Sequence, residues 1–314
     1  MKALKKTGKI ALIILIVLAS LFLLIFGGFN ALKFAIYSDY YSIKENVCKN
    51  PGLSDGFVCQ GICAVEEQDK ILVSGYMKDH SASRIYVTDL DDNSYWVEIS
   101  INGKKYSGHG SGIARKDNIL YLASENQVHL ISLSDVLNAK KGNVVNVYQT
   151  VDVTNEASFV YSDDNYLYVG EFHDGGKYVT THPYQTPEGK NHAIVCRYSF
   201  DDLTKPNLVY SIRDKVQGVC FTPNGKMILS TSYGLKSSVY YVYNLSDAVD
   251  LETTLDGAPV FGFTKCVKEI KGPAMAEGLD YYKGKVITLT ESASNKYIFG
   301  KFFFANKIVA LDFN

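Results

Sequence analysis

A unit of about 50 residues recurs five times between residue 61 and the C-terminus, and this repeat constrains the fold more than any other feature. Each unit opens with a short apolar segment, turns through a few polar residues and continues with further apolar segments. Segments of this length between turn signals are typical of β-strands. The opening segments read GICAVE, GIARK, SFVYSD, GVCFTP and GLDYY and begin at Gly61, Gly112, Ser158, Gly218 and Gly278.

The remaining segments of each unit predict a second, a third and usually a fourth strand. Four antiparallel strands repeated at this spacing are typical of β-propeller blades. A β-sandwich also has many short strands, but it does not require the same four-strand unit five times. We therefore predict an all-β fold, with a five-bladed β-propeller over residues 58–314. The predicted second strands are 71–76, 119–124, 166–172, 227–233 and 286–292, and the predicted fourth strands are 94–100, 143–149, 207–212 and 260–267.

The fifth unit reaches the end of the sequence after its third strand, at residue 314. Residues 33–57 form a linker that contains a strand-like segment, FAIYSDYYSIK, over 34–44. We predict that this segment supplies the missing fourth strand, which would close the ring and cover an exposed sheet edge. The alternative is a six-bladed ring in which residues 34–57 contribute a degenerate blade.

The N-terminus has the pattern of a membrane anchor. Four lysines within residues 1–9 precede the uncharged, apolar stretch 10–32. As a helix this stretch is about 34 Å long, enough to cross the hydrocarbon core of a bilayer. The lysines predict a cytoplasmic N-terminus, a transmembrane helix over 10–32 and an extracytoplasmic propeller on a single-pass cell-membrane protein. The alternative is a cleaved signal peptide.

Composition and motifs exclude several function classes. The net charge is −1, and no basic field indicates a nucleic-acid partner. The six cysteines have no zinc-ligand spacing, and we expect most of them to be buried apolar residues, with a disulfide from Cys48 to Cys59 or Cys63 as an alternative. The stretch GHGSG (108–112) has serine in fourth place, unlike the G-x-S-x-G elbow of esterases. No residue is therefore identified as catalytic.

Polar residues at the strand starts indicate a binding site. In a propeller, the first strands begin around the central channel on one face, called the upper face here. Gln60, Gln217 and Glu277 each directly precede the glycine of a first strand. We interpret Gln60-Gly61 as a channel residue followed by a glycine at a crowded axis, rather than as a β-bulge. The full set of predicted ligand-binding residues is Gln60, His109, Ser111, Gln217, Glu277, Glu291, His173 and Asp174.

The loops between second and third strands lie on the same predicted face. They contribute His173, Asp174 and Glu291 to the predicted site, and they also carry His80 and His182. A carboxylate at the axis needs a metal, a cation or water beside it, so Glu277 is the predicted metal ligand if a metal binds. The aromatic segment YIFGKFFFANK (297–307) is expected to be a buried strand, or else a lid or a partner contact.

From Gly61 onward the chain resembles the secreted and membrane-tethered propellers of the strictosidine synthase, paraoxonase and NHL type. It lacks the Trp-Asp pair that closes the third strands of WD40 repeats. The resemblance implies an extracytoplasmic propeller, although members of that group typically have six blades and several hold a central calcium ion. We expect a protein, glycan or small ligand on the upper face. The alternative is a calcium-dependent lactonase or esterase, with Glu277 as metal ligand and His109 or His173 as base.

Overall fold

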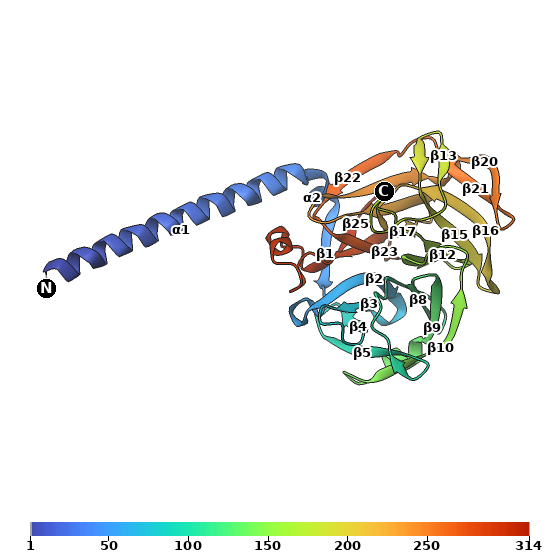
Figure 1. Ribbon diagram of the computed structural model, residues 1–314, viewed down its shortest axis with the longest axis horizontal. Coiled ribbons are helices and arrows are strands. Elements are labelled where there is room, and N and C mark those ends of the chain that lie inside the picture. The colour runs from blue at the N-terminus through green and yellow to red at the C-terminus, as the bar shows by residue number, and fades with distance from the viewer. Residues whose placement is uncertain (1, 314) are drawn as a thin grey trace.

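The computed structural model describes residues 2–313, with side chains from Gly8 onward. Two residues lie outside the described part: residue 1, the first of the predicted segment 1–9, and residue 314, the last of the predicted segment 58–314. The chain folds into an all-β propeller with one long apolar helix, α1 (Lys2–Ile36), which projects from the side of the propeller (Figure 1). Within α1, Gly8–Ile36 is long and apolar enough to cross a membrane, a property that a signal sequence shares.

The inner strands of the sheets form a closed ring in the order β2, β7, β11, β17, β23 and back to β2. A side chain on Gly112 would collide with Val160 of β11, and one on Gly278 with Gln60 and Gly61 of β2. These close approaches require glycine at the axis, as the repeat predicts. The inner strands are β2 (Phe57–Val65), β7 (Gly112–Lys116), β11 (Phe159–Ser162), β17 (Val216–Phe221) and β23 (Ala276–Tyr282).

Each inner strand pairs with a second strand, which pairs with a third, in antiparallel order. The buried apolar side chains lie between neighbouring sheets, as in the cluster of Ile62, Val73, Ile287 and Leu289. The second strands are β3 (Lys70–Met77), β8 (Ile119–Ser124), β12 (Tyr166–Gly170), β18 (Lys226–Thr231) and β24 (Lys285–Thr290). The third strands are β4 (Arg84–Asp89), β9 (Gln127–Ser132), β15 (Ala193–Ser199), β19 (Ser238–Asn244) and β25 (Lys307–Leu311).

The outermost strands differ most from the predictions. The predicted strand 260–267 does not join β19, because β22 takes that place. The first half of 260–267 instead lies in β21, which pairs in parallel with β16 and antiparallel with β20. The outer elements are β5 (Ser94–Ile101), β10 (Val144–Asp152), β16 (Asp202–Ile212), β20 (Ala248–Leu255), β21 (Ala258–Phe263) and β22 (Lys268–Gly272).

The strand at the edge of the last sheet is β1 (Lys44–Lys49), which pairs antiparallel with β25. The predicted location, 34–44, is therefore wrong by almost its full length, because 38–43 form the short helix α2 (Ser38–Ile43). The helix forms where Tyr40 is buried against the ring of Tyr240, with the two ring centroids 6.2 Å apart. The short elements that remain are β6 (Lys104–Lys105), β13 (Tyr184–Thr186), β14 (Gly189–Asn191) and α3 (Leu133–Leu137).

All six cysteines are free thiols, and five of them are buried. The expectation of buried apolar cysteines therefore agrees with the structure, and the alternative bridge from Cys48 to Cys59 or Cys63 is not formed. Cys59 illustrates the packing, because its thiol accepts a hydrogen bond from Asn50 Nδ2 at 3.1 Å inside the core. Burial raises the pKa of Cys59 well above the usual range of a thiol, which keeps it neutral.

Candidate functional site: a cavity at the mouth of the channel

A cavity of about 820 Å³ opens where the inner strands begin. Its volume lies in the range of pockets that enclose small ligands. The cavity is lined by every residue that precedes a predicted first strand, together with His109 and Glu291. The repeat thus brings distant positions of the chain to one place. The residues at the strand starts are Gln60, Ser111, Ala157, Gln217 and Glu277.

Irregular strand pairing surrounds the three large polar residues at the axis. The pairing of β2 with β3 skips Gln60, the pairing of β17 with β18 skips Gln217, and the pairing of β23 with β24 skips Glu277 and Gly278. A β-bulge leaves its extra residue out of the ladder and re-aims the side chain. The interpretation of Gln60-Gly61 without a bulge is therefore wrong. The bulge and the crowded axis occur together.

Two carboxyl groups lie at the floor of the cavity. Glu277 is only 2% exposed, and Gln60 Nε2 donates a hydrogen bond to Glu291 Oε2 at 3.1 Å. Burial, followed by the charge of Glu291, raises the pKa of Glu277 well above the usual range of a carboxyl group. Burial also raises the pKa of Glu291 to about 7, although Tyr297, Lys296 and Gln60 partly oppose the increase. A neutral carboxyl group can donate a hydrogen bond, so the floor offers both donors and acceptors.

The rim of the cavity combines aromatic rings with cations. Lys296 Nζ donates a hydrogen bond to the hydroxyl of Tyr76 and lies 4.5 Å from the centroid of that ring. The Tyr76 ring meets the His109 ring edge to face at 4.9 Å. Burial and the nearby charges of Lys296 and Lys177 lower the pKa of His109, which favours its neutral form. The rim therefore presents flat apolar faces beside polar groups.

The aromatic rim is the part of the site that the sequence analysis missed. Tyr76, Phe172 and Tyr233 all line the cavity. Each is the last residue of a predicted second strand, in ILVSGY, YLYVGEF and MILSTSY. An aromatic residue at the same position of three repeat units is therefore the sequence signal that could have predicted the rim. The other missed lining residues with polar or aromatic side chains include Glu125, Glu156, Lys177, Tyr178, Lys296 and Tyr297.

His173 and Asp174 do not line this cavity. His173 stacks on His192 with ring centroids 4.7 Å apart, and His192 Nδ1 lies 3.0 Å from Asp214 Oδ2. Among the side chains described from Gly8 onward, one group of three His, Cys, Asp or Glu residues is close enough to share a metal ion, and it consists of His173, His192 and Asp214. However, the backbone N–H of Thr180 donates to His173 Nδ1 at 3.1 Å, which leaves the ring proton of neutral His173 on Nε2. Hydrogen bonds therefore account for the group without a metal.

The remaining histidine of this loop has a separate partner. His182 Nδ1 lies 2.7 Å from Oε1 of the fully buried Glu171. This hydrogen bond is the main reason why the pKa of His182 is raised. His182 therefore holds the loop 173–191 against Glu171, the residue that follows β12.

A central calcium ion finds few ligands among the axial residues. Calcium takes six to eight oxygen atoms in proteins. The cavity floor offers the carboxyl groups of Glu277 and Glu291 and the amide of Gln60, and the two carboxylates belong to no group of three acidic or histidine side chains within the described part of the chain. The side chains at the axis thus do not make up the ligand set that the family resemblance implies.

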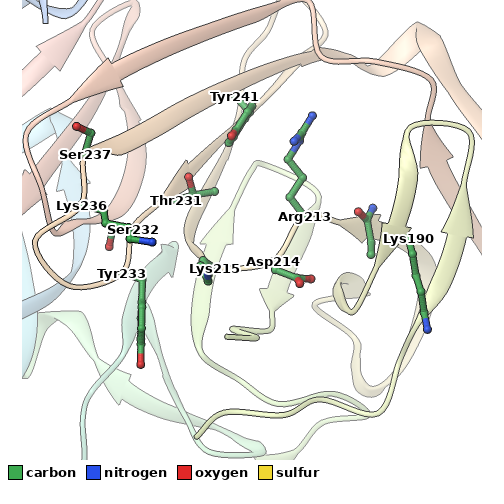
Figure 2. A pocket seen from close by; sticks show the side chains of 11 residues that line it. Lys190, Arg213, Asp214, Lys215, Thr231, Ser232, Tyr233, Lys236, Ser237 and Tyr241 are labelled. Atoms are coloured by element: carbon green, nitrogen blue, oxygen red, sulfur yellow. The ribbon is translucent and has the colours of Figure 1, made fainter. Parts of the chain in front are cut away.

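A second, smaller pocket of about 360 Å³ lies beside the cavity and shares Ser232 and Tyr233 with it (Figure 2). Its lining includes four cations, Lys190, Arg213, Lys215 and Lys236. Figure 2 shows that Arg213 and Lys190 extend in opposite directions. Glu188 also pairs with Arg213. The cations therefore do not converge on one anion, and the larger cavity is the stronger candidate site.

No family model and no curated protein matches the sequence. Among solved structures, the PQQ-bound aldose sugar dehydrogenase of Streptomyces coelicolor has a TM-score of 0.46 at 14% identity, covering 79% of this chain and 77% of that one. The WD40 β-propeller domain of Doa1 has a TM-score of 0.42 at 10% identity, covering 78% and 79%. The Pan2 WD40 domain of Neurospora crassa has a TM-score of 0.38 at 7% identity, covering 79% of both chains. These likenesses concern the fold alone.

Proposed function

We propose that this protein is a membrane-anchored, extracytoplasmic propeller of five four-stranded blades, related in general character to the strictosidine synthase, paraoxonase and NHL group. Strand pairing supports the blade number, because each of the five inner strands leads into a run of four. In the last run the fourth strand is β1, which comes from the N-terminal side. The apolar span Gly8–Ile36 and the lysines before it support the anchor and its orientation.

We further propose that the cavity binds a small hydroxyl-rich ligand such as a glycan. The observation that carries this proposal is the arrangement of bulges that turn Gln60, Gln217 and Glu277 towards one cavity. Amide and carboxyl groups can donate to and accept from hydroxyl groups, and the aromatic rings of the rim suit the apolar faces of sugar rings. No nucleophile motif supports catalysis, so binding is the function proposed.

The test is the thermal stability of the full-length protein in detergent with lactose, cellobiose or chitobiose. At a concentration near 100 times the dissociation constant, a bound sugar stabilises by about 2.7 kcal/mol, which corresponds to roughly 5–10 °C. Gln217→Ala and Glu277→Ala should abolish this increase. Asp152→Ala, at an exposed position of the outer strand β10 and outside the cavity, is the matched control and should retain it. The proposal fails if none of the three sugars raises the melting temperature, or if the cavity variants respond like Asp152→Ala.

A further inference from the structure

The segment that follows the cavity residues Lys296 and Tyr297 exposes an unusual number of large apolar side chains. Ile298 is 75% exposed, Phe299 68%, Phe304 52% and Phe302 45%. Residues 299–303 form a short 3-10 helix rather than the buried strand expected from the sequence. Large exposed apolar groups gathered in one place mark a contact with a partner or a membrane.

The structure indicates which contact this is, because the segment packs against α1. The ring of Phe304 meets Phe26 edge to face with centroids 5.5 Å apart, and Phe29 contacts both Phe302 and Phe303. An apolar groove of about 360 Å³ lies between the helix and the segment. Leu235, at the tip of the loop between β18 and β19, lines the same groove. Two loops of the propeller therefore meet the apolar helix.

The position of these contacts along α1 sets the depth of the segment. Lys33 is the first charged residue after the uncharged stretch, and its Nζ donates to the carbonyl of Phe303 at 3.3 Å. Phe26 precedes Lys33 by seven residues, which is about 10 Å along a helix axis. Lys33 Nζ also lies 5.0 Å from the centroid of the Phe304 ring. With the Lys33 ammonium at the level of the lipid headgroups, the Phe304 ring therefore lies no more than about 5 Å deeper, the shallow limit of an interfacial helix, which enters by about 5–10 Å.

We infer that residues 298–304 insert into the outer leaflet beside α1 and form a second membrane contact of the propeller. The occupant of the apolar surface is the acyl-chain region of a phospholipid bilayer, since the surface is continuous with the membrane span itself. The inference rests on the anchor proposed above. Lys301, which is exposed on the same short helix, suits the headgroup level.

This contact has a consequence for the cavity. Lys296 and Tyr297 line it immediately before the inserted residues, and Tyr233 and Gly234 line it immediately before Leu235. Both loops that touch the membrane span therefore also form the cavity wall. One edge of the cavity lies beside the bilayer, and a ligand held at the membrane surface has direct access to it.

Tryptophan quenching by brominated phosphatidylcholine tests the insertion on the full-length protein in vesicles. The chain has one tryptophan, Trp96, which stays in place as a common background. Phe299→Trp and, as a second variant, Ile298→Trp place a tryptophan in the segment. Tyr148→Trp is the matched control, because Tyr148 is an aromatic residue 55% exposed on β10, outside the segment. We expect brominated lipid to reduce the added emission at least twofold in the segment variants and to leave that of Tyr148→Trp unchanged.

Carbonate extraction of the same vesicles separates this inference from the anchor. If the protein stays in the vesicles but the segment variants are quenched no more than Tyr148→Trp, insertion is refuted and the anchor stands. If the protein is lost from the vesicles, both are refuted. Emission that shifts to the blue with rising protein concentration in detergent, without quenching by brominated lipid, would assign the segment to self-association and also refute insertion.

Discussion

Replacing Glu291 by glutamine should remove a loss of stability that the wild-type protein suffers as the pH rises. Burial raises the pKa of Glu291 from its ordinary value of 4.5 to about 7. Between pH 4.5 and about 7, the folded state therefore keeps a proton on Glu291 that the unfolded state has already released. Stability from this group is fully present below pH 4.5 and is lost as the pH rises through 7.

The magnitude follows from the size of the pKa change. Each pH unit corresponds to about 1.4 kcal/mol, so the full change is worth about 3 kcal/mol. Glu291 is only partly buried, and screening by water reduces this to about 2 kcal/mol. Glutamine preserves the shape and an acceptor for Gln60 Nε2. We therefore expect Glu291→Gln to leave stability nearly unchanged at pH 4.5 and to raise it by about 2 kcal/mol at pH 8.5.

The assay is denaturant unfolding of the full-length protein in detergent at both pH values. Glu125→Gln is the matched control, because Glu125 is an exposed carboxylate on the rim of the same cavity. Its effect on the free energy of unfolding should be the same at both pH values. A difference between Glu291→Gln and wild type that does not change with pH would refute the claim that Glu291 is desolvated at the cavity floor.

Three further substitutions test the packing around the site by thermal or denaturant unfolding. Gly61→Ala should lower the free energy of unfolding by about 1–3 kcal/mol, because the added Cβ would lie 2.6 Å from the backbone nitrogen of Ile113. The control is Gly176→Ala, which should cost little because no neighbour lies closer than 3.7 Å to its Cβ. Equal costs of the two substitutions would contradict the crowded axis. Tyr40→Ala should lower the free energy of unfolding by about 3 kcal/mol, because the buried ring stacks on Tyr240. The exposed Ser38→Ala should leave stability unchanged. If Tyr40→Ala loses no stability, α2 does not pack on the propeller. His182→Gln should cost about 1–2 kcal/mol at pH 5.5 and less at pH 8.5, because the raised pKa of His182 makes its bond to Glu171 strongest below pH 6.5 and weaker as the pH rises. The control is the exposed His80→Gln, which should show no such trend. A cost of His182→Gln that does not change with pH would exclude a charged pair.

Much of the fold could be predicted because a blade is a local unit. The first and second strands were predicted close to their observed positions, because the apolar residues that alternate along them pack against the neighbouring sheets. The outer strands were predicted less well. Residues 260–267 have a strand pattern, but the pattern does not say that Val260 and Phe261 pair with β16, or that β22 takes the place beside β19. Sheet edges accept partners from elsewhere in the chain, and such long-range choices leave no local period.

The candidate site was predictable to the extent that it follows the repeat. Gln60, Ser111, Gln217 and Glu277 occupy equivalent positions, so a ring of inner strands brings them together at one cavity. His173 and Asp174 follow no such rule, because they lie in the long loop 173–191. In the structure His173 is buried against His192 instead of facing the cavity.

The sequence by itself determined the repeating strand unit, the glycines at the axis and the apolar N-terminal helix, because each is a periodic or compositional feature of neighbouring residues. Only the tertiary structure decided that Gln60 would hydrogen-bond to Glu291, 231 residues away, and that Glu277 would be desolvated beside it. It also decided that Phe302–Phe304 would lie against α1. Burial, pKa and contacts across such separations depend on the closure of the ring, which brings distant segments together without leaving a signal in either one.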